Sequence, residues 1–400
     1  MQPQPPPFDP RALDAFVTLV GARAWSARMA EIAEFARSGP RAGQAIRQRH
    51  ALELAVERLR GDLIRPATTA ERHAARLAAA AAVLARRLGA RGRAALRERL
   101  LAAMAGDGTL IPVFHMLRTA DLQRSRGFSV HFAGLADDAP YDLLLTRGRV
   151  EAEVACDVVS AEAGRLVQRG AWVQLADRVD GELQAWLTTY PGRYLLKMTL
   201  PQGLRAAPEC GALEALQGRI HRLLATRGRR DDEDGAVLRL DPLLLAGTRS
   251  DGAGLLPLLR REFGPEAHLS ATAVGGALFV IAARAGRADE VAVAVRHRLS
   301  AIAPTSLSGT RPGILAMFID DTDRGEWRGL RDSLELESET RQFLACRSAR
   351  PVVAVTCASR FELFGVSAPD AVEDGELRFR NPAHPEASAT ELASAVLSTV

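Results

Sequence analysis

Carboxylates alternate with apolar residues in VEAEVACDVV, the segment at residues 150–159. The run DLLLT precedes it, and a glycine between two such runs is typical of the tight turn of a β-hairpin. With Arg147 and Gly148 as the turn, Asp142 at the start of the first strand lies opposite Glu153 on the second. The spacing therefore predicts a hairpin that carries acids on facing positions.

Side chains alternate across a sheet, so Asp142, Glu151 and Glu153 share one face in this register. Opposed carboxylates cost free energy unless their charge is compensated, and a divalent cation such as Mg²⁺ is a common compensator. The alternative is a solvated acidic face that nearby arginines neutralise; these are Arg147, Arg149 and Arg165.

The elements around the hairpin follow a definite order. Residues 110–127 predict a helix, and FSVHFAGL predicts a short strand before the hairpin. A long helix over 163–190 and the strand RYLLKMTL at 193–200 are expected after it. The order is helix, three strands, helix, strand.

This order resembles the core of the PD-(D/E)XK, or restriction-endonuclease-like, nuclease superfamily. The resemblance covers roughly residues 109–200; Pro140, Tyr141 and Asp142 match the PD element, and VEAEVACD matches the (D/E)XK strand. It implies a mixed sheet in which Asp142 and Glu153 bind Mg²⁺, and a metal-activated water that attacks a phosphodiester. Glu151 or Asp157 would assist as further metal ligands.

The lysine of that motif is missing. If Glu153 is the acid, Ala155 stands at the lysine position; if the acid position is Ala155, Asp157 stands there. The missing positive charge is one that the transition state uses, so efficient cleavage is not expected. Lys197, the only lysine of the chain, is expected in the strand after the long helix. It is either a migrated catalytic lysine or a side chain lying along a sheet edge.

Basic and amide side chains are expected at the start of the long helix, beside the acidic face. Arg165, Gln168 and Arg169 would contact a phosphate backbone there, or the arginines would form salt bridges with Glu151 and Asp157. Both interpretations stay open.

The charge of the chain is unevenly distributed. Residues 1–130 hold 21 Arg against 11 Asp and Glu, a balance of +10, which leaves −6 of the net +4 for residues 131–400. A basic module suits a polyanionic partner, with DNA expected before RNA. Alternatively, the helices rich in Ala and Arg are solvated faces or pack on a protein partner.

The expected fold class is α/β: an N-terminal helical module, a restriction-endonuclease-like mixed-sheet core and further α/β elements. Residues 1–9 predict a disordered tail, 10–107 a basic module of four helices, 108–230 the core, and 236–400 an α/β region that either continues the core sheet or stands apart. An acidic loop, DDEDG at 231–235, is expected between the last two.

Three further patterns set limits on function. In FIDDTD, Asp320, Asp321 and Asp323 follow an expected strand, where α/β proteins often bind ligands, although an ordinary acidic loop is the simpler interpretation. The four cysteines form no CxxC pair, so neither a zinc site nor a disulfide framework is expected. No secretory or membrane-spanning segment is predicted, which favours the cytoplasm and no membrane partner.

Three functions are consistent with these patterns. The first is a nuclease-like fold that binds nucleic acid, or acts as a scaffold, without cleaving. The second is an active Mg²⁺-dependent nuclease with a rewired site built from Asp142, Glu153 and Lys197. The third is a protein-interaction module without nucleic acid.

Overall fold

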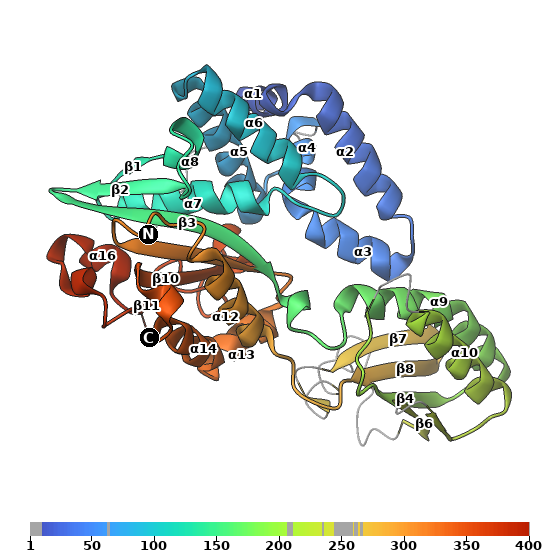
Figure 1. The fold of residues 1–400 in the computed structure, drawn as a ribbon. Helices are drawn as coiled ribbons and strands as arrows, with labels where there is room; N and C mark the ends of the chain where they lie inside the picture. The colour runs from blue at the N-terminus through green and yellow to red at the C-terminus, as the bar shows by residue number, and fades with distance from the viewer. Residues whose placement is uncertain are drawn as a thin grey trace. The chain divides into compact units, whose positions relative to one another are not determined.

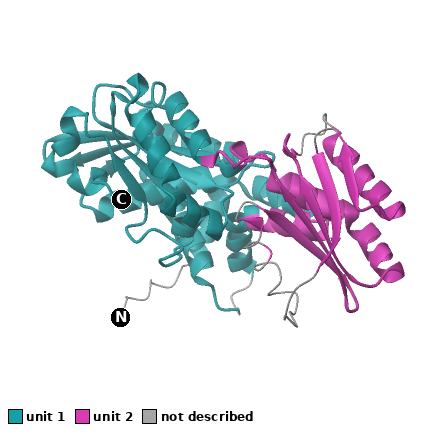
Figure 2. Ribbon diagram, turned by 90° about the horizontal axis from the view of Figure 1, so that it is seen from below, with its two compact units in different colours: residues 1–33, 49–161, 292–400 teal, residues 34–48, 162–291 magenta. Residues whose placement is uncertain are grey.

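The chain folds into two compact units (Figure 2). The computed structural model describes residues 10–61, 65–205, 211–233, 236–243, 259, 263–264 and 267–399. The first unit comprises 1–33, 49–161 and 292–400, and the second comprises 34–48 and 162–291. Both segments of the second unit are therefore inserted between segments of the first along the chain, and the boundaries differ from those expected after residues 107 and 230. The predicted tail at 1–9 lies outside the described residues.

The N-terminal module is helical as predicted, but the described part contains six helices before residue 107 rather than four. They are α1 (Pro10–Val20), α2 (Ala22–Phe35), α3 (Pro40–Arg49), α4 (Ala51–Gly61), α5 (Thr69–Arg87) and α6 (Ala90–Ala103). Gly21, with φ +106°, separates α1 from α2, because its conformation is one that glycine adopts at low cost. His50 separates α3 from α4.

Helix α5 is central to the helical core of the first unit. A capping box starts it, in which Thr68 and Glu71 satisfy each other's backbone N–H groups. Its buried face consists largely of alanine, which lets α1 and α4 approach closely. The same hydrophobic core includes residues of the first unit's sheet.

The first unit contains a six-stranded mixed sheet in the order β1-β2-β3-β9-β10-β11. The strands are β1 (Ser129–His131), β2 (Leu143–Arg147), β3 (Val150–Ser160), β9 (Gly313–Asp320), β10 (Val352–Ser359) and β11 (Leu377–Arg380). Strands β1, β2 and β3 are antiparallel, β9 and β10 run parallel to β3, and β11 is antiparallel to β10. Every residue of β9 and β10 is buried, as expected for central strands covered on both faces.

Helices cover both faces of this sheet. Figure 1 shows α7 (Ile111–Ser125) with the N-terminal helices on one face and α12 (Val291–Ile302), α13 (Arg324–Asp332) and α14 (Glu335–Leu344) on the other. Short helices complete the unit: α8 (Ala133–Ala136), α15 (Arg360–Leu363) and α16 (Ala393–Val396).

The helix and strand that follow the hairpin in the chain are not its neighbours in the sheet. The chain leaves β3, forms the second unit and returns through α12 to β9, which pairs with β3 along its whole length. The expectation that the long helix and RYLLKMTL complete the hairpin's sheet is therefore wrong. Helix α12 and strand β9 occupy those places.

The second unit has its own five-stranded sheet, in the order β5-β6-β4-β8-β7. Most of α3 belongs to this unit, and its other elements are α9 (Arg169–Thr189), β4 (Arg193–Thr199), α10 (Ala212–Ala225), β5 (Arg230–Glu233), β6 (Ala236–Pro242), β7 (His268–Val274) and β8 (Ala277–Arg284). Helices α9 and α10 share one hydrophobic core with the sheet.

Two predictions about the region after residue 230 need correction. Residues 231–233 belong to β5 rather than to an acidic loop, while 234–235 lie outside the described residues. The expected α/β region at 236–400 is divided, because β6, β7 and β8 belong to the second unit whereas β9, β10 and β11 continue the first unit's sheet. A further helix, which LLPLLRREF predicts over 255–263, lies mostly outside the described residues.

Candidate functional site

The β2–β3 hairpin forms, but in a register two residues away from the predicted one. Arg147 pairs with Val150, so Gly148 and Arg149 make the turn, with Gly148 at φ +62°. Leu144 lies opposite Glu153, and the expected pairing of Asp142 with Glu153 is wrong. The N–H of Asp142 instead donates to the Val154 carbonyl at 3.0 Å, just before the start of β2.

Both oxygens of the Asp142 carboxylate have partners within the protein. Its Oδ1 forms an ion pair with Arg99 of α6, and its Oδ2 accepts a hydrogen bond from the Cys156 N–H at 2.8 Å. The Asp142 side chain is 15% exposed. A guanidinium and a backbone amide therefore already neutralise and orient this carboxylate.

Glu153 and Glu151 share a different cation, Arg311, from the segment before β9. Glu153 is fully buried; it accepts hydrogen bonds from the N–H of Ser308 at 2.8 Å and from the Ser308 hydroxyl. Arg311 Nη1 lies 3.6 Å from Glu153, and its Nε donates to Glu151 at 2.8 Å. The hydrogen bond from Arg311 to Glu151 raises the pKa of the arginine.

Asp157 is bound by helix α12. Arg298 donates to both carboxylate oxygens, at 2.6 and 2.9 Å, and these hydrogen bonds raise the pKa of Arg298. Asp157 occupies the lysine position of the motif in one of the two predicted alignments. A positive charge is present near this position, but it belongs to an arginine that is already paired.

The four acids named as metal ligands are thus paired with three arginines, of which Arg311 serves both Glu151 and Glu153. Within the described ranges, no three His, Cys, Asp or Glu side chains are grouped so that they could hold a metal. The predicted convergence of Asp142, Glu151 and Glu153 on one another is not seen in this structure. Mg²⁺ binding stays a prediction.

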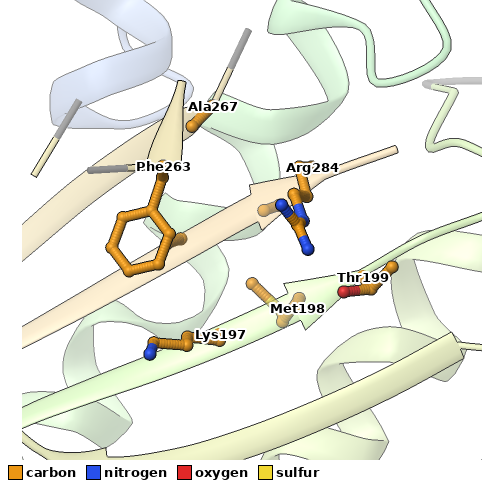
Figure 3. A pocket seen from close by; sticks show the side chains of 8 residues that line it. Lys197, Met198, Thr199, Phe263, Ala267 and Arg284 are labelled. Atoms are coloured by element: carbon orange, nitrogen blue, oxygen red, sulfur yellow. The ribbon is translucent and has the colours of Figure 1, made fainter. Parts of the chain in front are cut away.

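Lys197 lies on β4, in the sheet of the second unit and not in the sheet of the hairpin. Its Nζ is 3.6 Å from Asp241 and 5.2 Å from the ring centre of Phe263. It borders a cavity of about 270 Å³ (Figure 3). The cavity's lining is Lys197, Met198, Thr199, Phe263, Ala267, Ala282, Ala283 and Arg284.

The predicted phosphate-binding residues precede α9 or begin it. The helix starts at Arg169 with Gln168 as its N-cap, later than predicted. Arg165 is 2% exposed and forms an ion pair with Glu162, whose other oxygen accepts from the Arg169 N–H at 2.8 Å. Arg165 is thus buried and paired within the second unit in this structure, and contact of Arg165, Gln168 and Arg169 with phosphate stays a prediction.

A second polar group lies at the carboxyl ends of the parallel strands β3, β9 and β10. Arg49 donates to both oxygens of Asp321 at 3.0 Å, and the Ser160 hydroxyl donates to Asp321 at 2.6 Å. Asp320 is paired with Arg360 at 3.1 Å. Asp320 and Asp321 of FIDDTD are therefore part of a hydrogen-bonded network, and Asp323 is the N-cap of α13.

The pKa values of the two adjacent carboxyls, Asp320 and Asp321, are shifted in opposite directions. Burial and the neighbouring Asp321 raise the pKa of Asp320. Burial also acts on Asp321, but Arg49 and the hydrogen bond from Ser160 outweigh it and lower that pKa. Asp321 has φ +58°, a conformation that costs a non-glycine residue free energy. The signal in the sequence was a polar last residue in each of three neighbouring strands: Ser160, Asp320 and Ser359.

Comparison with known proteins adds no relative: no family model, no curated protein and no solved structure matches this chain. None of the helices in the described ranges combines the length and apolar character needed to span a lipid bilayer.

Proposed function

We propose that this protein binds nucleic acid through a PD-(D/E)XK-like core that no longer cleaves. The observation that carries the proposal is the pairing of the candidate catalytic carboxylates with arginines of the same unit. Asp142 is bound to Arg99, and Asp157 is bound to Arg298. Acidic residues are present at the positions of a nuclease site, but arginines of the same unit neutralise their charges.

The topology of the first unit supports the nuclease-like part of the proposal. When the inserted residues 162–291 are set aside, the order is α7, the antiparallel strands β1, β2 and β3, then α12 and β9. Strand β9 lies beside β3 and runs parallel to it. This is the helix, three strands, helix and strand that the resemblance implies, with Asp142 directly before β2.

The electrostatics support binding rather than cleavage. In the superfamily, carboxylates hold Mg²⁺ and a lysine assists the attacking water. Here the donor set does not fit such a centre, because Glu153 is buried against Ser308 and Asp142 is occupied by Arg99. The lone lysine, Lys197, belongs to the other sheet. The excess of arginine in residues 1–130 supplies the charge for a polyanionic partner, which we propose to be DNA before RNA.

The test is a titration with Mg²⁺ and with Mn²⁺ of labelled DNA and RNA incubated with the wild type, Asp142→Ala and Lys197→Ala. All three proteins are expected to bind with an affinity that falls with added salt and to leave the strands intact. Metal-dependent cleavage by the wild type that both variants lack would establish the rewired nuclease instead. Absence of both binding and cleavage would leave the protein-interaction module.

A further inference from the structure

The corner between α5 and α6 carries a cluster of exposed arginines. We call it the arginine corner and define it as Arg86, Arg87, Arg91, Arg93 and Arg97, all of which are exposed. The two helices are joined by only Leu88 and Gly89, and the Nε of Arg93 donates to the Ala85 carbonyl at 3.0 Å. This bond links the first turn of α6 to the last turn of α5, and Figure 1 shows the two helices as neighbours in the helical part of the first unit.

The charge of the arginine corner is poorly compensated. From Arg72 to Arg97 the sequence contains seven arginines and no Asp or Glu. Arg91 forms an ion pair with Asp138 at 2.8 Å, but both side chains are more than 70% exposed, so the pair is weak. Glu98 follows directly as the nearest acid along the chain. Arg86, Arg87 and Arg97 form no ion pair with any residue in the described part of the chain.

The exposed residues between these arginines have small side chains, and none of them is aromatic. Ala90 and Ala94 are exposed on α6 among the arginines, so no bulky side chain keeps a partner away from the helix. No Phe, Trp or Tyr occurs between residues 71 and 104, so α5 and α6 supply no aromatic ring for base stacking at this corner. Guanidinium groups without stacking partners are suited to phosphate oxygens, which carry no sequence information.

We infer that the arginine corner binds the phosphodiester backbone of a nucleic acid independently of its sequence. This inference rests on the proposed function and names the surface that performs it. Each guanidinium that contacts a phosphate releases condensed counterions, so the contacts are visible as a salt dependence of affinity. Duplex and single-stranded partners share this chemistry, and the experiment distinguishes them.

The test compares the full-length protein with the triple variant Arg86→Gln, Arg87→Gln and Arg97→Gln. Glutamine keeps the helix propensity and removes the charge. The control is Arg229→Gln, Arg347→Gln and Arg350→Gln, which removes the same charge from three exposed arginines elsewhere. Binding of labelled duplex DNA, single-stranded DNA and RNA is measured over a range of NaCl concentrations, and thermal unfolding verifies that every variant is folded.

The triple variant is expected to weaken binding about tenfold or more, with the slope of log affinity against log salt reduced by about 2 to 3. The control is expected to bind within about twofold of the wild type, and unlabelled duplexes of unrelated sequence are expected to compete equally. Salt-sensitive wild-type binding that the triple variant retains in full would overturn the inference and leave the proposed function standing. No binding of any nucleic acid by the wild type would overturn both.

Discussion

The buried carboxylate of Glu153 accepts hydrogen bonds from both the backbone N–H and the hydroxyl of Ser308. Ser308 lies 155 residues further along the chain, in the segment that leads into β9. The residue that the nuclease resemblance assigns to a metal therefore joins two parts of the first unit in this structure.

This relationship predicts a structural cost for Glu153→Ala. The substitution leaves a cavity at a fully buried position and removes the acceptor of two Ser308 donors and a partner of Arg311, so the free energy of unfolding should fall by about 2–4 kcal/mol. Glu151→Ala is the matched control, since Glu151 is 41% exposed and should lose less than about 1 kcal/mol. Urea unfolding measures both, and equal losses would contradict the assignment of Glu153 to the core.

The pair of Asp157 and Arg298 should contribute little to stability despite its good geometry. Arg298 is 48% exposed, so the solvent screens the attraction. A double-mutant cycle with Asp157→Asn and Arg298→Gln should give a coupling free energy of about 0.5–1 kcal/mol that decreases with added NaCl. A coupling several times larger, insensitive to salt, would mean that the pair is shielded from solvent.

His115 should make stability depend on pH in the acidic range. Burial lowers the pKa of His115 from 6.5 to about 4, and its Nε2 is 2.9 Å from the Ala316 carbonyl. The unfolded chain takes up the proton first, so stability is full above pH 6.5 and decreases as the pH falls towards 4, by about 3 kcal/mol for this group. His115→Gln keeps a donor for Ala316 and cannot titrate. Urea unfolding from pH 7 to pH 4 should show a smaller loss in this variant than in the wild type, and identical losses would refute the assignment.

Arg41 should stabilise the second unit at neutral pH. It is paired with Asp177 at 3.3 Å and Asp180 at 2.8 Å, and it donates to the Ala271 carbonyl. Burial tends to raise the pKa of Asp180, but hydrogen bonds from Thr272 and Arg41 outweigh it and lower that pKa. That stabilisation is present above the unfolded pKa of Asp180 and is lost as the pH falls through the lower folded value.

Arg41→Ala is therefore expected to cost about 1–3 kcal/mol at pH 7 and less at a pH where Asp180 is protonated. Unfolding measured at both pH values checks this. An effect of the same size at both would show that the ion pair with Asp180 is not its source.

The sequence pattern correctly located most elements but did not determine how they pair. A shift of two residues in the hairpin leaves the same side chains on each face, so alternation could not distinguish a turn at Arg147 and Gly148 from one at Gly148 and Arg149. Local periodicity also predicts α9 and β4 correctly without showing which sheet β4 joins. That choice depends on long-range contacts, here the pairing of β3 with β9.

The partners of the candidate site's acids could not be predicted from the sequence for the same reason. The arginines that bind Asp157 and Glu151 are separated from them by 141 and 160 residues. No local pattern links such distant positions. The acids themselves could be identified because they alternate on one strand, whereas their neutralisation depends on the folded arrangement of α12 and the segment before β9.

Binding without cleavage is tested most directly by measuring complex formation and strand integrity in one experiment. An end-labelled DNA duplex is incubated with the full-length protein and Mn²⁺, and then analysed on native and denaturing gels. We expect a retarded complex at low salt that disappears as NaCl is added, with the strands intact throughout. Shortened strands that appear only with protein and metal would contradict the loss of catalysis, and an unshifted duplex at low salt would contradict nucleic-acid binding itself.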